Sequence, residues 1–95
     1  MRQEAVTMKA GTWEKKAYDL YHQGVMAAVA DGEWHPSDEI HAMILGPDAP
    51  RWDRLSVSLC IDVLHMVAGR LERRVVVDGD GLLVDYEYRI AEGKA

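Results

Sequence analysis

The sequence has a single cysteine, Cys60, so it cannot form an internal disulfide. It contains no run of 18 apolar residues, the length that a membrane-spanning helix needs. Its first residues also lack the basic and then apolar pattern of a secretion signal. These absences predict a cytoplasmic protein without a membrane segment.

Catalytic and metal-binding patterns are also scarce. There is no phosphate-cradling glycine motif and no nucleophile elbow. Cys60 and His65 are five residues apart on an expected helix, so they lie on different faces and form no nucleophile–base pair. Asp38 and His41 lie near each other and near His35, but no second histidine follows at metal-ligand spacing. We expect solvent-exposed helix residues there.

The D-G-D-G sequence at residues 78–81 begins like a calcium-binding loop. However, Leu82 replaces the third oxygen ligand and Arg89 occupies the twelfth position, so the calcium interpretation fails. Together these observations predict a protein that is not an enzyme and that has neither a metal nor a cofactor.

The composition is that of one small globular domain. With 95 residues, 48% apolar and 28% charged, the chain can bury one modest core. Its net charge is −5, but the charge is unevenly distributed. Residues 31–50 contain five acids and no base, whereas residues 51–74 contain five arginines and three acids. Because nucleic acid is negatively charged, only this basic segment suits contact with it.

Hydrophobic periodicity predicts helices at residues 12–30, 37–45 and 55–74. Thr12 is the expected N-cap of the first helix, and Gly24 within it indicates a close helix contact. Ser37 is the expected N-cap of the second helix, with a start at His35 and Pro36 as an alternative. We expect a flexible arm at residues 1–11 and a flexible tail at residues 91–95.

The third helix is the longest and is expected to lead directly into a hairpin at residues 75–90. Its apolar stripe recurs every four residues, with further apolar residues beside it, and two-residue alternation follows the D-G-D-G turn. We expect Trp34 in a short strand beside the hairpin and Trp13 in the core. The expected stripe of the third helix consists of Leu55, Leu59, Val63, Val67 and Leu71.

The order helix, D-G-E-W, short helix, long helix, L-E-R-R-V-V-V and hairpin resembles the winged helix-turn-helix superfamily. The resemblance covers residues 12–90 and implies an α+β domain of three helices followed by a β-hairpin wing. It further implies a small bacterial or phage regulator that binds double-stranded DNA through its third helix, usually as a homodimer. We expect the dimer to form through the first helix or the terminal segments.

Two departures from the family pattern concern DNA binding. The connection between the second and third helices is expected to have at least nine residues, which is longer than usual in the family. The wing tip has Asp78 and Asp80 where family members that grip DNA commonly have Arg or Lys. These carboxylates would repel phosphates, so we expect the wing to stand away from the minor groove.

The candidate DNA contacts lie on the basic segment and around the third helix. Arginine suits phosphates or guanine edges, and hydroxyls at a helix start suit phosphates. Alternatively, these arginines offset the helix dipole or pair with the acids of residues 31–50. The candidate residues are Arg51, Arg54, Ser56, Ser58, His65, Arg70 and Arg73.

The sequence also permits a second function, that of an adaptor which binds a protein partner rather than DNA. Trp52 lies in a polar segment between Arg51 and Asp53, and Trp and Arg are enriched in interface hot spots. In this interpretation, Trp52 and the acidic wing residues Asp78 and Asp80 are the contact residues. If Trp52 instead folds over the edge of the core, this interpretation loses its anchor.

Overall fold

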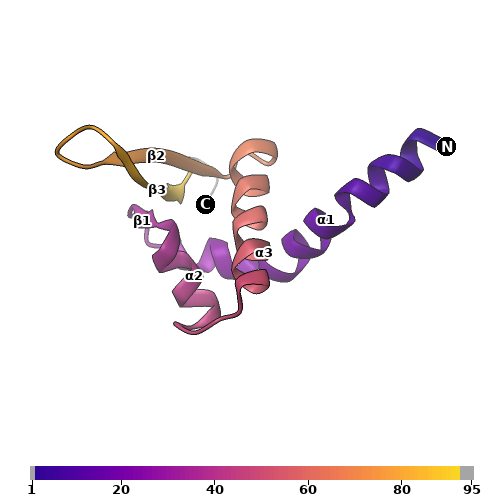
Figure 1. Cartoon of the computed structure of the whole chain (residues 1–95), viewed down its shortest axis with the longest axis horizontal. Coiled ribbons are helices and arrows are strands. Elements are labelled where there is room, and N and C mark those ends of the chain that lie inside the picture. Colours follow the sequence, from indigo (N-terminus) through magenta and orange to yellow (C-terminus); the bar gives the residue numbers. More distant parts are fainter. Residues whose placement is uncertain (1, 93–95) are drawn as a thin grey trace.

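The computed structural model describes the backbone of residues 2–92 and the side chains of residues 13–92. The first helix, α1, spans Arg2–Ala28, and its N-terminal part extends away from the rest of the molecule (Figure 1). The helix therefore begins ten residues earlier than the Thr12 cap predicted, and residues 2–11 belong to it rather than to a separate arm. Most of the expected C-terminal tail, residues 93–95, lies outside the described residues.

Two short elements follow α1. Strand β1 is His35–Pro36, so Trp34 directly precedes the strand rather than lying in it. Helix α2 spans Ser37–Leu45, with Pro36 as its N-cap. The expected capping role of Ser37 is therefore wrong: its hydroxyl donates a 2.8 Å hydrogen bond to Asp85 on the last strand instead. This bond connects α2 to the sheet.

Helix α3 spans Arg51–Asp62 and continues as a π-helical turn, η1, at Val63–Val67. It begins four residues before the expected start, because Pro50 provides its N-cap. The connection from α2 is therefore short, residues 46–50, and the long connection expected from the sequence is absent.

The long helix also ends earlier than expected. Gly69 has a φ of 65°, a left-handed conformation that glycine adopts without strain. The amide of Arg70 then donates to the carbonyl of Leu64 at 2.8 Å, which closes the helix end. Residues 71–74, expected as helix, therefore form the start of a strand.

The sheet has three antiparallel strands in the order β1-β3-β2. Strand β2 is Leu71–Val77 and strand β3 is Leu83–Ile90, and together they form the hairpin that projects from the helices (Figure 1). Their register runs from Leu71 opposite Ile90 to Val77 opposite Leu83, with an irregularity at Val76 and Val77. The α+β class is confirmed, and the layout is compatible with that of a winged helix.

The core lies where α1, α2, α3 and the base of the hairpin meet. On α3 the buried face differs from the expected stripe: Leu55 and Val67 are exposed and Leu59 is only half-buried. Trp13 is exposed as well, so its expected place in the core is wrong. The buried core residues are Val25, Ala28, Val29, Ile40, Val57, Cys60, Ile61, Leu64, Leu71 and Tyr88.

Gly24 confirms the expected close helix contact. A β-carbon at this position would lie 3.4 Å from the side chain of Ile44 on α2, which is tighter than most real contacts. Glycine thus lets α1 and α2 approach closely. None of the helices within residues 2–92 is both long and apolar enough to cross a membrane.

Candidate nucleic-acid interface

The N-terminal end of α3 presents two exposed arginines. Arg51 is the first residue of the helix and Arg54 lies in its first turn. Among the side chains of residues 13–92, no carboxylate lies within ion-pair distance of either guanidinium. Both charges lie at the positive end of the helix dipole, where an anion is favoured and a cation is not. The structure therefore leaves both arginines available for an anionic partner.

An open cleft of about 240 Å³ lies beside these arginines, between α2 and α3. It is lined by Asp38, His41, Arg51, Arg54, Leu55 and Ser58. Inside it, Nε2 of His41 and the hydroxyl of Ser58 form a 3.0 Å hydrogen bond. Burial lowers the pKa of His41, and the nearby Arg54 adds to this, while Asp38 opposes it. His41 is therefore neutral near pH 7, and its Nε2 can accept a hydrogen bond from the hydroxyl of Ser58.

Ser56 lies on another side of α3, against α1. Its hydroxyl accepts a 3.1 Å hydrogen bond from Nε1 of Trp13. The Trp13 ring lies 5.9 Å from that of Trp52, with the planes inclined at 56°. Ser56 therefore connects two helices and does not line the cleft, and its contact with DNA stays a prediction. Trp52 is in contact with α1 and is still 69% exposed.

The remaining predicted contacts are at the other end of the helix. Nδ1 of His65 donates to the carbonyl of Leu71 at 3.0 Å, so this half-buried ring connects η1 to β2. Arg70 is half-buried in the turn between those elements. Arg73 is exposed on β2, with its guanidinium 4.5 Å from the centre of the Tyr86 ring. At 1.5 Å per helical residue, about 20 Å of helix separates Arg54 from the end of η1. The predicted contacts thus form two groups.

At the wing tip, the two aspartates have different roles. Oδ1 of Asp78 accepts hydrogen bonds from the amides of Asp80 and Leu82, at 2.9 and 3.0 Å. The Asp78 amide donates to the carbonyl of Leu82 at 2.9 Å. Asp78 therefore stabilises the turn, whereas Asp80 is exposed and only its amide takes part in these bonds.

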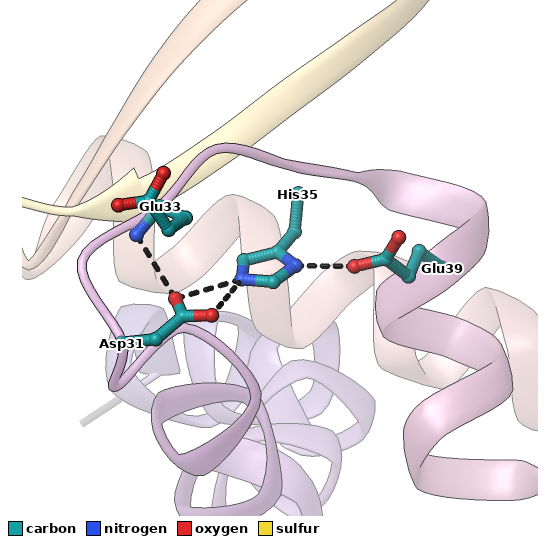
Figure 2. Close-up of polar contacts among 4 residues, drawn as sticks. All are labelled: Asp31, Glu33, His35 and Glu39. Carbon is teal, nitrogen blue, oxygen red and sulfur yellow. Dashed lines mark hydrogen bonds and ion pairs between the residues drawn. The ribbon is translucent and has the colours of Figure 1, made fainter.

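A polar cluster that was not expected from the sequence lies where α1, β1 and α2 meet. His35 is buried, and its Nε2 is 2.8 Å from Oδ1 of Asp31 while its Nδ1 bonds Glu39 (Figure 2). Oδ1 of Asp31 also accepts the amide of Glu33 at 2.9 Å. The hydrogen bonds to Glu39 and Asp31 raise the pKa of His35 despite its burial. The i, i+4, i+8 spacing of acid, histidine and acid was the available signal for this cluster.

Trp34, beside this cluster, is covered by two arginines of the sheet. The guanidiniums of Arg74 and Arg89 lie 4.5 and 4.6 Å from the centre of its ring. Arg74 is also paired with Glu87, and Arg89 with Glu72, each at 2.6 Å. These two arginines are thus engaged within the fold, in contrast to Arg51 and Arg54.

The chain was compared with family models, with curated proteins and with solved structures, and none of them matches it. Functional inference therefore depends on the geometry described above.

Proposed function

We propose that this protein binds double-stranded DNA as a regulator or accessory factor, with the N-terminal half of α3 as the contact element. The single observation that supports the proposal is the pair of exposed arginines, Arg51 and Arg54, at the positive end of α3, which have no carboxylate partner among the side chains of residues 13–92. The winged-helix resemblance gives α3 the same role. Such a function places the protein in the cytoplasm.

In this proposal the two guanidiniums contact phosphates, which position the protein on the duplex without reading its sequence. The hydrogen bond between His41 and Ser58 holds the cleft beside them in shape. Arg73 extends the positive surface onto the wing, while the exposed Asp80 keeps the tip away from the backbone. Binding through so few cations is expected to be weak and sensitive to salt.

Fluorescence anisotropy with a mixed-sequence duplex tests the proposal. With about 2–4 phosphates neutralised per subunit, log affinity should fall with log salt at a slope of about −2 to −4. Arg51→Ala and Arg54→Ala should each weaken binding and reduce the slope by about 1. Lys15→Ala is the matched control, because this exposed cation is already paired with Asp19 at 2.9 Å and should not affect binding.

Two results would contradict the proposal. One is the absence of binding by the wild-type protein even at about 50 mM salt, where phosphate contacts are strong. The other is an equal response of Arg54→Ala and Lys15→Ala, which would indicate only a general effect of net charge.

The second candidate function, that of a protein-binding adaptor, is favoured by one observation. Trp52 is 69% exposed at the start of α3, beside Trp13, and large exposed aromatics are typical of interface anchors. If this function is the correct one, Trp52→Ala should abolish capture of the partner protein, and no duplex should bind at physiological salt.

A further inference from the structure

We propose that two copies of the chain associate through their wings, with β2 of one copy pairing antiparallel to β2 of the other. This inference does not depend on DNA binding. It places the dimer contact on the hairpin rather than on the first helix or the terminal segments, where the sequence placed it.

The first argument is that β2 is an edge strand. In the order β1-β3-β2 it has β3 on one side and no strand of this chain on the other within the described residues. The hairpin also projects beyond the helices, so its outer part is accessible (Figure 1). An open edge presents unpaired amides and carbonyls, which can pair with another strand.

The hydrogen-bond pattern shows which residues present these groups. The amide of Ala91 donates to the carbonyl of Arg70 at 2.9 Å, so this pair is hydrogen-bonded. Because antiparallel pairs alternate, the main-chain groups of Arg73, Val75 and Val77 point away from β3. The extra residue at the irregularity, Val84, is on β3, so the alternation along β2 is continuous.

The second argument is the composition of this edge. Val75 and Val77 are 55% and 53% exposed, and the nearby Leu82, Leu83 and Val84 are also exposed. Natural edge strands are commonly protected by lysine, proline or a bulge within the edge itself. Residues 75–77 have none of these, so contact between two copies would cover apolar surface that the monomer exposes.

The third argument is charge complementarity, which selects the second copy as the partner. Basic residues Arg73 and Arg74 precede the three valines, and Asp78 follows them. With Val76 opposite Val76 of the second copy, Arg74 of each copy faces Asp78 of the other. In this register Glu72 would face Asp80, but Asp80 lies in the turn beyond the strand. A register with Val75 opposite Val75 would instead place Glu72 opposite Asp78, directly after the strand, as a repulsive pair.

The atoms needed for these two ion pairs are available. The turn hydrogen bonds of Asp78 use Oδ1, so they leave Oδ2 for a guanidinium. Arg74 is engaged by Glu87 and lies over the Trp34 ring, but its side chain is half exposed and its guanidinium has five N–H donors, so some remain for Asp78 of the second copy. The other open edge, residues 83–86 of β3, has an aspartate and no base, so two copies of that edge offer no such complementarity.

Sedimentation measurements of mass against protein concentration test the proposal. The wild-type protein should shift from 10.7 kDa to twice that mass. Val75→Pro removes only an outward-pointing amide, which an edge strand tolerates, and should weaken association about tenfold or more, equivalent to about 1.4 kcal/mol. Arg74→Glu places a carboxylate opposite Asp78 at each end of the contact between the two copies, and it should weaken association by a similar factor.

Two matched controls separate this surface from others. Arg89→Glu removes a guanidinium with the same kind of stacking and ion pair as Arg74, but on the inner strand β3, so the dimer should remain. Val67→Lys introduces charge at an exposed valine on η1, away from the wing, and should also have no effect. Circular dichroism verifies that each variant folds.

The proposal is overturned if the wild-type protein stays monomeric up to about 1 mM, because the dissociation constant would then be weaker than that concentration. It is equally overturned if a dimer forms but folded Val75→Pro and Arg74→Glu associate as wild type does. Loss of the dimer in Val67→Lys would place the contact on the helices instead.

Discussion

His35 is predicted to act as a charged connection between the turn that follows α1 and helix α2, so replacing it should make the fold both less stable and less sensitive to pH. Both ring nitrogens face carboxylates that can only accept when ionised, so both nitrogens must donate and the ring must be protonated. The ring is buried, and it lies on β1, opposite Tyr88 of β3. His35→Gln removes the charge and one of the two contacts.

The expected loss of unfolding free energy in His35→Gln follows from the two hydrogen bonds of the ring. Each bond to a charged group contributes about 1.5–3 kcal/mol when well protected from water. Here the carboxylate side chains of Asp31 and Glu39 are 53% and 49% exposed, so solvent screening lowers this to about 1 kcal/mol for each bond. Because His35→Gln removes one bond and the charge that strengthens the other, we expect it to lower the free energy of unfolding by about 1–2 kcal/mol, which is a fall in Tm of about 4–16 °C for a domain of this size.

The sign of the pH dependence follows from the direction of each pKa shift. The pKa of His35 is raised above its ordinary 6.5, because the folded state holds the proton more tightly. Its contribution is therefore complete below pH 6.5 and is lost as pH rises through the raised value. The pKa of Asp31 is lowered from 3.8, chiefly by its hydrogen bond to His35, so its contribution is lost in acid below that value. The stability difference between wild type and variant should thus be largest between these limits.

His41 makes the free energy of unfolding depend on pH in the opposite direction to His35. The effect of His35 must therefore be measured as the difference between wild type and variant. Its pKa is lowered by burial, so the folded state disfavours its proton and stability rises with pH around 6.5. Because wild type and His35→Gln share His41, its contribution cancels in their difference.

Urea unfolding of both proteins from about pH 4.5 to pH 9 measures this difference. His22→Gln is the control, because His22 bonds a backbone carbonyl, that of Tyr18 at 2.7 Å, rather than two carboxylates. A stability difference that does not decrease at alkaline pH would refute the reasoning, and so would the same decrease in His22→Gln.

Two further predictions concern the core and the wing tip. Leu71→Ala should lower the free energy of unfolding by about 2–5 kcal/mol, because Leu71 is only 3% exposed, whereas Val67→Ala should have little effect; chemical denaturation measures both. Asp80→Lys should strengthen DNA binding with little dependence on sequence, since it removes a repulsive charge without breaking the turn bonds of Asp78, and a flat anisotropy response would show that the wing lies far from the duplex.

The sequence predicted the order of the elements, but not the end of the third helix. Leu71 follows Val67 by four residues, so it fits a helical stripe, and it also fits the two-residue alternation of the strand. The three valines at 75–77 indicated a later strand start. The helix instead ends at Gly69, and Leu71 is buried because it pairs with Ile90 on β3. That long-range pairing has no local signal.

In the candidate site, too, contacts between residues close in the sequence could be predicted, whereas contacts between distant residues could not. The sequence singled out Arg51 and Arg54 by their charge but placed them before the third helix, whereas they lie in its first turn. The partners of Ser56 and Ser58 could not be predicted, since they lie 43 and 17 residues away in the sequence. The His35 cluster was accessible from spacing, because each carboxylate is four residues from the histidine.

A net charge of −5 is unfavourable for DNA binding. In the two proposals, however, the acidic wing is used for contact between two copies, and the arginines at the start of α3 are used for contact with DNA. Pairing of two wings would bring Asp78 of each copy against Arg74 of the other, so it would neutralise part of the acidic wing. Arg51 and Arg54, which have no carboxylate within ion-pair distance among the side chains of residues 13–92, are at the start of α3, at the opposite end of the helix from the turn into the wing. A dimer would therefore present two such arginine pairs on one particle, and linked sites bind more tightly than single ones when both can engage. The salt dependence distinguishes these states: about 2–4 phosphates per subunit predict a slope of about −4 to −8 for a dimer with both sites engaged, and half of that for a monomer.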